Sequence, residues 1–153
     1  MDYGQIRVEG GTKLTVDYIG CGSSASQSGK ITVTGPGSVL EIGDQASCNY
    51  LILQNGGEVI SHKPFFLNNT HTLTLGPKTA FTITSEDEDE SVLMLGGDNS
   101  KLSNRAAFDE AIRDLIAGGA LSNQYHAGEY NGSYMLLDEN DRPVRNLTLY
   151  GEG

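Results

Sequence analysis

The stretch KITVTGPGSVLEIG, residues 30–43, places two short alternating strands on either side of a glycine–proline–glycine turn. Ile31 and Val33 alternate with threonines before the turn, and Leu40 and Ile42 alternate with other residues after it. Period-2 alternation indicates β-strands with one buried face, and glycine and proline are the residues that tight corners require. Taken alone, the stretch predicts either an isolated hairpin or one corner of a repeating unit.

The same corner chemistry recurs along the chain every 20 to 25 residues. In each copy a glycine is followed by glycine or proline, and an apolar–x–apolar strand precedes it. A second short strand follows the first four copies. The corner residues are Gly10, Gly11, Gly35, Pro36, Gly56, Gly57, Gly76, Pro77, Gly96 and Gly97. A fixed period of this length predicts stacked layers in which equivalent strands pair in parallel, that is, a β-solenoid. Consecutive hairpins in a β-sandwich are the alternative, but they do not explain the fixed period.

The chain changes character after residue 102. Residues 104–121 predict a helix with one apolar face, capped by Ser103 or Asn104 at its start and by a glycine pair at its end. The apolar face consists of Ala107, Phe108, Ala111, Ile112, Leu115 and Ile116. Two strands are expected after it, at 133–137 and 144–150. We therefore expect repeats over 1–102 and a helix-plus-hairpin cap over 103–153, within one compact domain.

The N-terminal end of the predicted stack has no such cover. Ile6 and Val8 lie in the first strand, and Leu14 and Val16 lie in the second. Exposed strand edges promote association, and natural proteins usually protect them. We therefore predict that these four residues form a self-association edge, which makes the protein a homo-oligomer or part of a larger protein assembly.

Charge and hydropathy exclude several classes of partner. The formal net charge is −10 over 153 residues, which disfavours binding to nucleic acids or to anionic membrane surfaces. The sequence has no apolar run long enough to span a membrane, so no membrane insertion is expected. Its first residues lack the features of a signal peptide.

The most acidic segment is SEDEDE, residues 85–90. Asp87, Asp89 and Glu90 are weak candidates for binding calcium, but the run has no glycine and does not match the spacing of a calcium loop. A solvated loop is the simpler interpretation. We therefore predict no cofactor and no catalytic residues, with calcium as a minor alternative.

Cys21 and Cys48 fall at equivalent places in the first two repeats. Stacked layers would bring them close enough for a disulfide, and two reduced thiols fit the same placement. The sequence leaves both alternatives open.

The segments GKITVTGPGSVLEIG and YLILQNGGEVIS resemble the short β-solenoid repeats of autotransporter passenger domains and exported bacterial surface proteins. Viral fibre and decoration proteins have similar repeats. The segment FDEAIRDLIAGGAL is similar to the helix that follows such repeats in exported proteins. This resemblance implies an all-β, right-handed parallel β-solenoid of about five short coils, with a scaffolding, adhesive or surface-display role.

We therefore expect a non-enzymatic structural or interaction protein that self-associates in a virion (as a decoration or fibre protein) or in an extracellular surface or filament assembly. A carbohydrate-binding adhesin fragment is the alternative, with a glycan as ligand. A polysaccharide lyase or hydrolase built on a β-helix ranks behind both. Such an enzyme needs carboxylates or a basic residue aligned along one face, and the acidic residues here gather in presumed loops.

Overall fold

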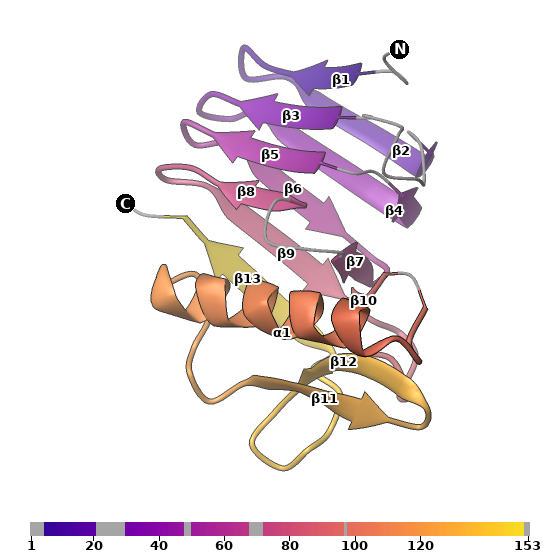
Figure 1. Ribbon diagram of the computed structural model, residues 1–153. Coiled ribbons are helices and arrows are strands. Elements are labelled where there is room, and N and C mark those ends of the chain that lie inside the picture. The colour runs from indigo at the N-terminus through magenta and orange to yellow at the C-terminus, as the bar shows by residue number, and fades with distance from the viewer. Residues whose placement is uncertain (1–4, 21–29, 48–49, 68–71, 97, 152–153) are drawn as a thin grey trace.

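A computed structural model describes residues 5–20, 30–47, 50–67, 72–96 and 98–151 of the chain (Figure 1). Four short strands form sheet A, in the order β1-β3-β5-β8. Their bounds are β1 Gln5–Val8, β3 Lys30–Thr34, β5 Tyr50–Gln54 and β8 Leu73–Leu75. All neighbours in this sheet are parallel and in register, so that Ile31 lies between Ile6 and Leu51. The first four strands that the sequence repeat aligned are therefore neighbours in sheet A.

Sheet B lies behind sheet A and has the order β13-β9-β6-β4-β2. Its strands are β2 Lys13–Gly20, β4 Val39–Ser47, β6 Glu58–Ser61, β9 Ala80–Thr84 and β13 Asn146–Tyr150. The strands β2, β4, β6 and β9 are parallel, and β13 joins β9 in the antiparallel sense. We call a strand of sheet A and the sheet B strand that follows it a layer, so β1 and β2 form the first layer.

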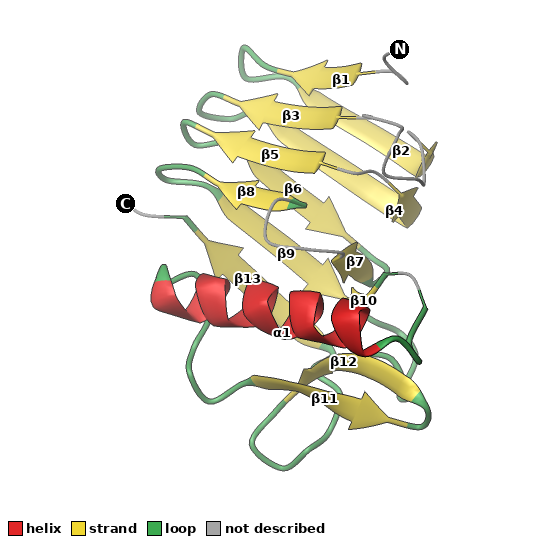
Figure 2. Cartoon of the chain, in the orientation of Figure 1, coloured by secondary structure: helices red, strands yellow, loops and turns green. Residues whose placement is uncertain are grey.

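A third sheet and the helix lie at the far end of the stack (Figure 2). Sheet C has the order β11-β12-β10-β7, with β10 antiparallel to β12 and parallel to β7. Its strands are β7 Phe65–Leu67, β10 Leu93–Leu95, β11 His126–Tyr130 and β12 Ser133–Leu137. The helix α1 spans Leu102–Ala117.

The main hydrophobic core lies between the sheets and beneath the helix. In β3 and β5 alternate residues are buried, as period-2 alternation requires. The same cluster of buried residues includes Phe108 and Ile112 from α1 and Leu149 from β13. Phe65 and Phe81 meet edge to face in this core, with ring centroids 5.3 Å apart. The repeats and the C-terminal elements therefore share one core.

Glycine at the corners has two different physical roles. Gly35 adopts φ of +99°, a left-handed conformation that a side chain would strain. At Gly57 a side chain is excluded by lack of space, because a Cβ there would collide with the carbonyl of Val33 in the preceding layer. In the fourth corner the positive φ belongs to Lys78, at +61°, rather than to a glycine. The corner pattern thus reflects close stacking as well as backbone conformation.

The predicted fold class is wrong. Sheets B and C combine parallel and antiparallel strands, and the three sheets do not form a single all-parallel solenoid. Parallel pairing ends at β8 in sheet A and at β9 in sheet B, where β13 adds an antiparallel strand. The physical reason is that β13 runs in the direction opposite to the repeat strands. An antiparallel strand can pair with the free edge of β9 without another repeat.

The fifth repeat is the clearest local error. The pattern Leu93-x-Leu95 predicted a strand stacked on β8, but β10 pairs with β7 and β12 in sheet C. All three residues of β10 are buried, because Met94 packs against Met135 and Leu137 in a second apolar cluster. An apolar strand that is buried on both faces does not report which sheet it joins.

The predicted helix cap is also wrong. The helix begins after Lys101, and no side chain caps its first turn. Its C-terminal end follows the prediction, since Gly118 is the C-cap and Gly119 adopts φ of +82°.

Candidate functional site

The strands β1 and β2 are the outermost strands of sheets A and B. Among the described residues, no strand pairs with the outer edge of either one. Of the four predicted edge residues, Val8 is buried, Ile6 and Val16 are half-buried, and Leu14 is 37% exposed. The structure therefore places the predicted edge residues together in the first layer.

The burial of equivalent residues shows where the core stops. Leu14, Leu40, Val59, Phe81 and Leu149 form one continuous row across sheet B. The last four are completely buried, with 0% exposure each, and Leu14 is the exception. All five face the core by strand alternation, so the exposure of Leu14 arises from its position at the end of the row. The first layer is an apolar surface that the described residues leave partly uncovered.

The opposite end of the stack is closed by specific contacts. Phe108 of α1 packs edge to face on Tyr134 of β12, with ring centroids 5.7 Å apart. The guanidinium of Arg105 lies 5.1 Å from the centre of the same ring and reaches Glu129 of β11 at 2.7 Å. The backbone N–H of Tyr134 donates to Asn99 Oδ1 at 2.7 Å. These contacts fix the helix to sheet C and bury the end of the core.

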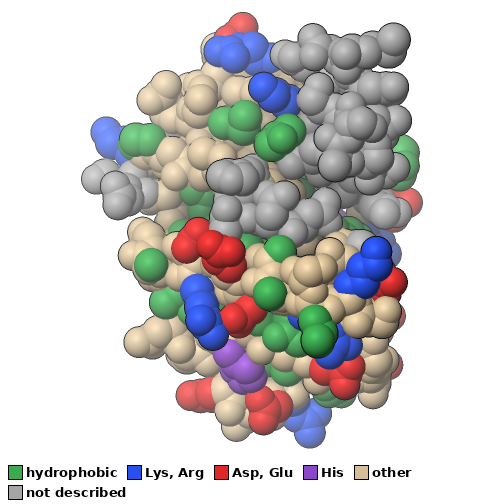
Figure 3. Space-filling model, viewed as in Figure 1, with side chains coloured by type: hydrophobic (Ala, Val, Ile, Leu, Met, Phe, Trp, Pro, Cys, Tyr) green, Lys and Arg blue, Asp and Glu red, His purple; other side chains and the backbone are tan. Residues whose placement is uncertain are grey.

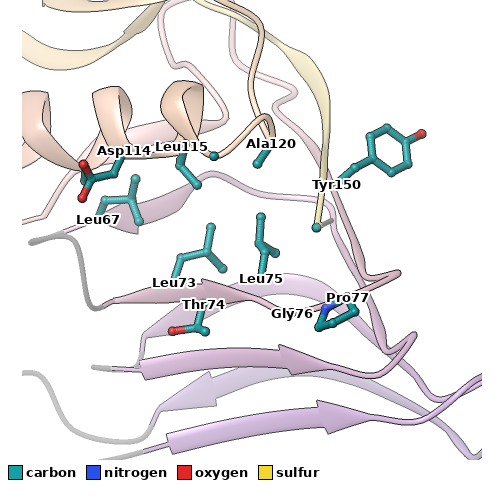
Figure 4. A pocket seen from close by; sticks show the side chains of 13 residues that line it. Leu67, Leu73, Thr74, Leu75, Gly76, Pro77, Asp114, Leu115, Ala120 and Tyr150 are labelled. Atoms are coloured by element: carbon teal, nitrogen blue, oxygen red, sulfur yellow. The ribbon is translucent and has the colours of Figure 1, made fainter. Parts of the chain in front are cut away.

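A cavity of about 370 Å³ lies between α1 and the outer edge of β8 (Figure 4). Leu73 and Leu75 of β8 line one wall, Leu115 and Ala111 of α1 line the other, and Tyr150 stands at one side. Among the described strands, β8 pairs only with β5, so its other edge faces this cavity. The cavity can accept an apolar group.

Two titratable side chains are found among the described residues that line the cavity. Asp114 is the one charged side chain among its lining residues. Tyr150 of β13 is the other titratable side chain. Sequence analysis missed this cavity because the predicted fifth strand would have occupied the edge of β8.

The acidic run forms a loop beside Lys63 and Arg145. The Asp89 N–H donates to Asp87 Oδ1 at 2.8 Å. Partial burial, and then the hydrogen bond and charge of Asp87, raise the pKa of Glu90 above its ordinary value. Among the described residues, no three histidine, cysteine or acidic side chains are grouped so that they could hold a metal ion. The predicted candidates Asp87, Asp89 and Glu90 are thus neighbours in one loop, in which the Asp87 carboxylate accepts a hydrogen bond from the Asp89 N–H.

Polar contacts between strands lie on the outer face of sheet B. The Glu41 carboxylate is 2.9 Å from His62 Nε2 and 3.4 Å from Lys13 Nζ. The hydrogen bond from His62, followed by that from Lys13, lowers the pKa of Glu41. These contacts link the first layer to the next two across the solvent-facing side of the sheet.

Two predicted features lie outside the described residues, namely the Cys21–Cys48 pair and the corner residue Gly97. A disulfide and two reduced thiols therefore both stay open for this pair. The other corner residues occupy turns or the ends of strands, as expected.

The surface carries both signs of charge. In Figure 3 the acidic and basic side chains of the described residues are interspersed on the visible face and do not gather into one field. Within the described parts of the chain, no helix combines the length and apolar character that crossing a bilayer requires.

Comparison with protein-family models, curated proteins and solved structures found no match to this chain.

Proposed function

We propose that this protein is a non-enzymatic structural protein that self-associates through its first layer. The observation that supports the proposal is the row of core-facing residues in sheet B, in which Leu14 alone is exposed. Covering the first layer would bury Leu14 and the half-buried Ile6 and Val16, and burial of apolar surface favours association.

The backbone supports the same proposal. The outer edges of β1 and β2 carry N–H and C=O groups with no strand partner among the described residues. Another strand at either edge would satisfy these groups and continue the sheet. The resemblance of the repeats to those of surface proteins and viral fibres makes a virion or cell-surface assembly the setting that we propose.

The proposal is tested by the mass of the full chain in solution. Sedimentation velocity over a range of protein concentrations should show a concentration-dependent oligomer. Leu14→Asp places a charge in the apolar contact and should shift the protein to the monomer. A monomer at every concentration for the unmodified chain would contradict the proposal.

The matched control is Leu102→Asp. Leu102 is 80% exposed at the start of α1, at the closed end of the stack. The same substitution there should leave the oligomer unchanged, so any general effect of replacing a surface leucine by aspartate is excluded. Circular dichroism and thermal unfolding confirm that both variants remain folded. Equal loss of the oligomer in both variants would contradict self-association through the first layer.

A further inference from the structure

We infer that the partner of the first layer is a second copy of this chain, paired antiparallel through β2 about a two-fold axis at Thr15. This inference rests on the proposed self-association and adds its geometry. It follows from the direction of the free backbone groups of β2 and from the charges that flank Thr15.

The backbone N–H and C=O groups of alternate residues in β2 point either toward β4 or toward the open edge. The Val39 N–H donates to the carbonyl of Thr12 at 3.0 Å, so Thr12 faces β4. Alternate residues of a parallel strand face the same neighbour, which places Leu14 and Val16 on the β4 side. The backbone groups of Lys13 and Thr15 therefore point to the open edge. Asp17 lies at a register shift between Val16 and Tyr18, where the additional residue is in β4, so the alternation of β2 extends to Asp17.

The register between the two copies of β2 follows from these outward-facing backbone groups. In an antiparallel pair, residues that exchange two hydrogen bonds lie directly opposite each other, and both must have outward-facing backbone groups. Pairing Thr15 with Thr15 of the second copy meets this condition for all three residues. It sets Lys13 opposite Asp17 of the second copy, and the two-fold axis repeats this pair. A shift by two residues in either direction also aligns outward groups, but it sets Lys13 or Asp17 opposite a threonine.

The charges of Lys13 and Asp17 favour the same register. Lys13, Thr15 and Asp17 are exposed, and Asp17 has no ion-pair partner within the described part of the chain. Among the described residues, Lys13 forms an ion pair only with Glu41, at 3.4 Å. Opposite charges placed directly across an antiparallel pair stabilise it, and like charges destabilise it. A parallel pairing in register would instead set Lys13 against Lys13.

The same register covers the apolar end of the core. It sets Leu14 opposite Val16 of the second copy in the closely spaced, non-hydrogen-bonded position. The exposed Leu14 would then be buried by a residue that already faces the core in its own copy. One arrangement therefore satisfies the strand edge, the charges and the apolar surface.

A charge-exchange experiment tests this register. Lys13→Asp and Asp17→Lys each create like charges across the axis and should each raise the dimer dissociation constant roughly tenfold at low ionic strength. The double variant exchanges the two charges and should restore the dissociation constant of the unmodified chain. An equimolar mixture of the two single variants should form a heterodimer, because every facing pair then has opposite signs.

Two controls separate these effects from local ones. Glu58→Lys makes the same charge change as Asp17→Lys on an exposed residue of β6, away from the edge, and should leave the dissociation constant unchanged. Glu41→Gln removes the contact of Lys13 within the same copy and should not weaken the dimer. Thermal unfolding checks that every variant is folded.

The outcomes distinguish this inference from the function on which it rests. An unmodified chain that is always monomeric overturns both. An oligomer that Leu14→Asp disrupts, but that neither charge variant weakens, overturns the β2 register and keeps the self-association. Weakening by the single variants without restoration in the double variant or the mixture also overturns the register.

Discussion

The two ends of the stacked layers are finished in different ways. At the C-terminal end, β13 adds an antiparallel strand to β9, β12 does the same to β10, and α1 packs against sheet C. At the N-terminal end, β1 and β2 continue the repeating pattern up to the last described strand and leave Leu14 exposed. The same alternating sequence therefore gives a buried leucine at position 40 and an exposed one at position 14.

This difference shows what a repeat can and cannot supply. Each layer provides a neighbour for the layer before it, so a repeat always leaves one unsatisfied edge at each end. At the C-terminal end of sheet B the edge is closed by β13, which does not follow the repeat, whereas β8 of sheet A has no further strand partner among the described residues. An equivalent cover for the first layer is supplied, in our proposal, by another copy of the chain.

The largest difference in the free energy of unfolding is expected between alanine variants of Leu40 and Leu14, which are neighbours in register. Leu40→Ala opens a cavity in a fully buried site and should lower the free energy of unfolding by roughly 2–5 kcal/mol. Leu14→Ala should cost the monomer only about 1 kcal/mol, because part of its side chain is already in water.

Chemical denaturation of both variants at a protein concentration that favours the monomer measures this difference. Equal losses would mean that Leu14 is as well covered in the monomer as Leu40, and the contrast between the two ends would then disappear.

An intermediate effect is expected at the corners. Gly57→Ala pushes a methyl group into the Val33 carbonyl and should cost about 2 kcal/mol, since backbone must move to make room. Gly10→Ala, at the corner of the first layer, meets no atom within 4 Å and strains only its backbone, with φ of +70°. Its cost should be about 1 kcal/mol. Thermal unfolding distinguishes the two; the reverse order would contradict close stacking of the inner layers.

The smallest changes in stability are expected at Glu41 and Glu90, whose pKa values are shifted from the ordinary glutamate value in opposite directions. The pKa of Glu41 is lowered by His62 and Lys13, so Glu41 stabilises the fold above its unfolded pKa, about 4.3. That stability is lost as pH falls through the lowered folded value. The pKa of Glu90 is raised by burial and by Asp87, so its contribution is present below the unfolded pKa and is lost as pH rises through the raised folded value.

Glutamine substitutions therefore have opposite results. Glu41→Gln should lower the melting temperature at pH 7, and by less as the pH falls toward 3. Glu90→Gln should raise it at pH 7 and leave it unchanged at pH 3. Differential scanning calorimetry of each variant at both pH values measures these shifts, and shifts of the same sign at pH 7 would refute the assignment.

Much of the local structure could be predicted from the sequence, and the fold class could not. Alternation at Ile31 and Val33 and the spacing of the corners identified the strands and their parallel neighbours in sheets A and B. The same reasoning failed at β10, because Met94 is buried as well as Leu93 and Leu95. Alternation reports which face is buried but carries no information on which sheet the strand joins.

The candidate site was predicted in part. The sequence predicts a self-association edge at Ile6, Val8, Leu14 and Val16, and these residues lie in β1 and β2, the outermost strands of the two sheets. The charges of Lys13 and Asp17 had no evident role until the backbone direction of β2 was known. The cavity beside β8 could not be foreseen, since it exists only because sheet A stops there.

The sequence by itself determined the period, the corners, the residues that face the core and the helix near the C-terminus. These are local properties, set by alternation, glycine conformation and helical periodicity over a few residues. Only the tertiary structure decided how the stack ends, because that depends on contacts between distant segments, such as Leu149 with Phe81 and Phe108 with Tyr134. The repeat specifies a neighbour for each layer, and the free energy of the whole chain decides which segment covers the last one.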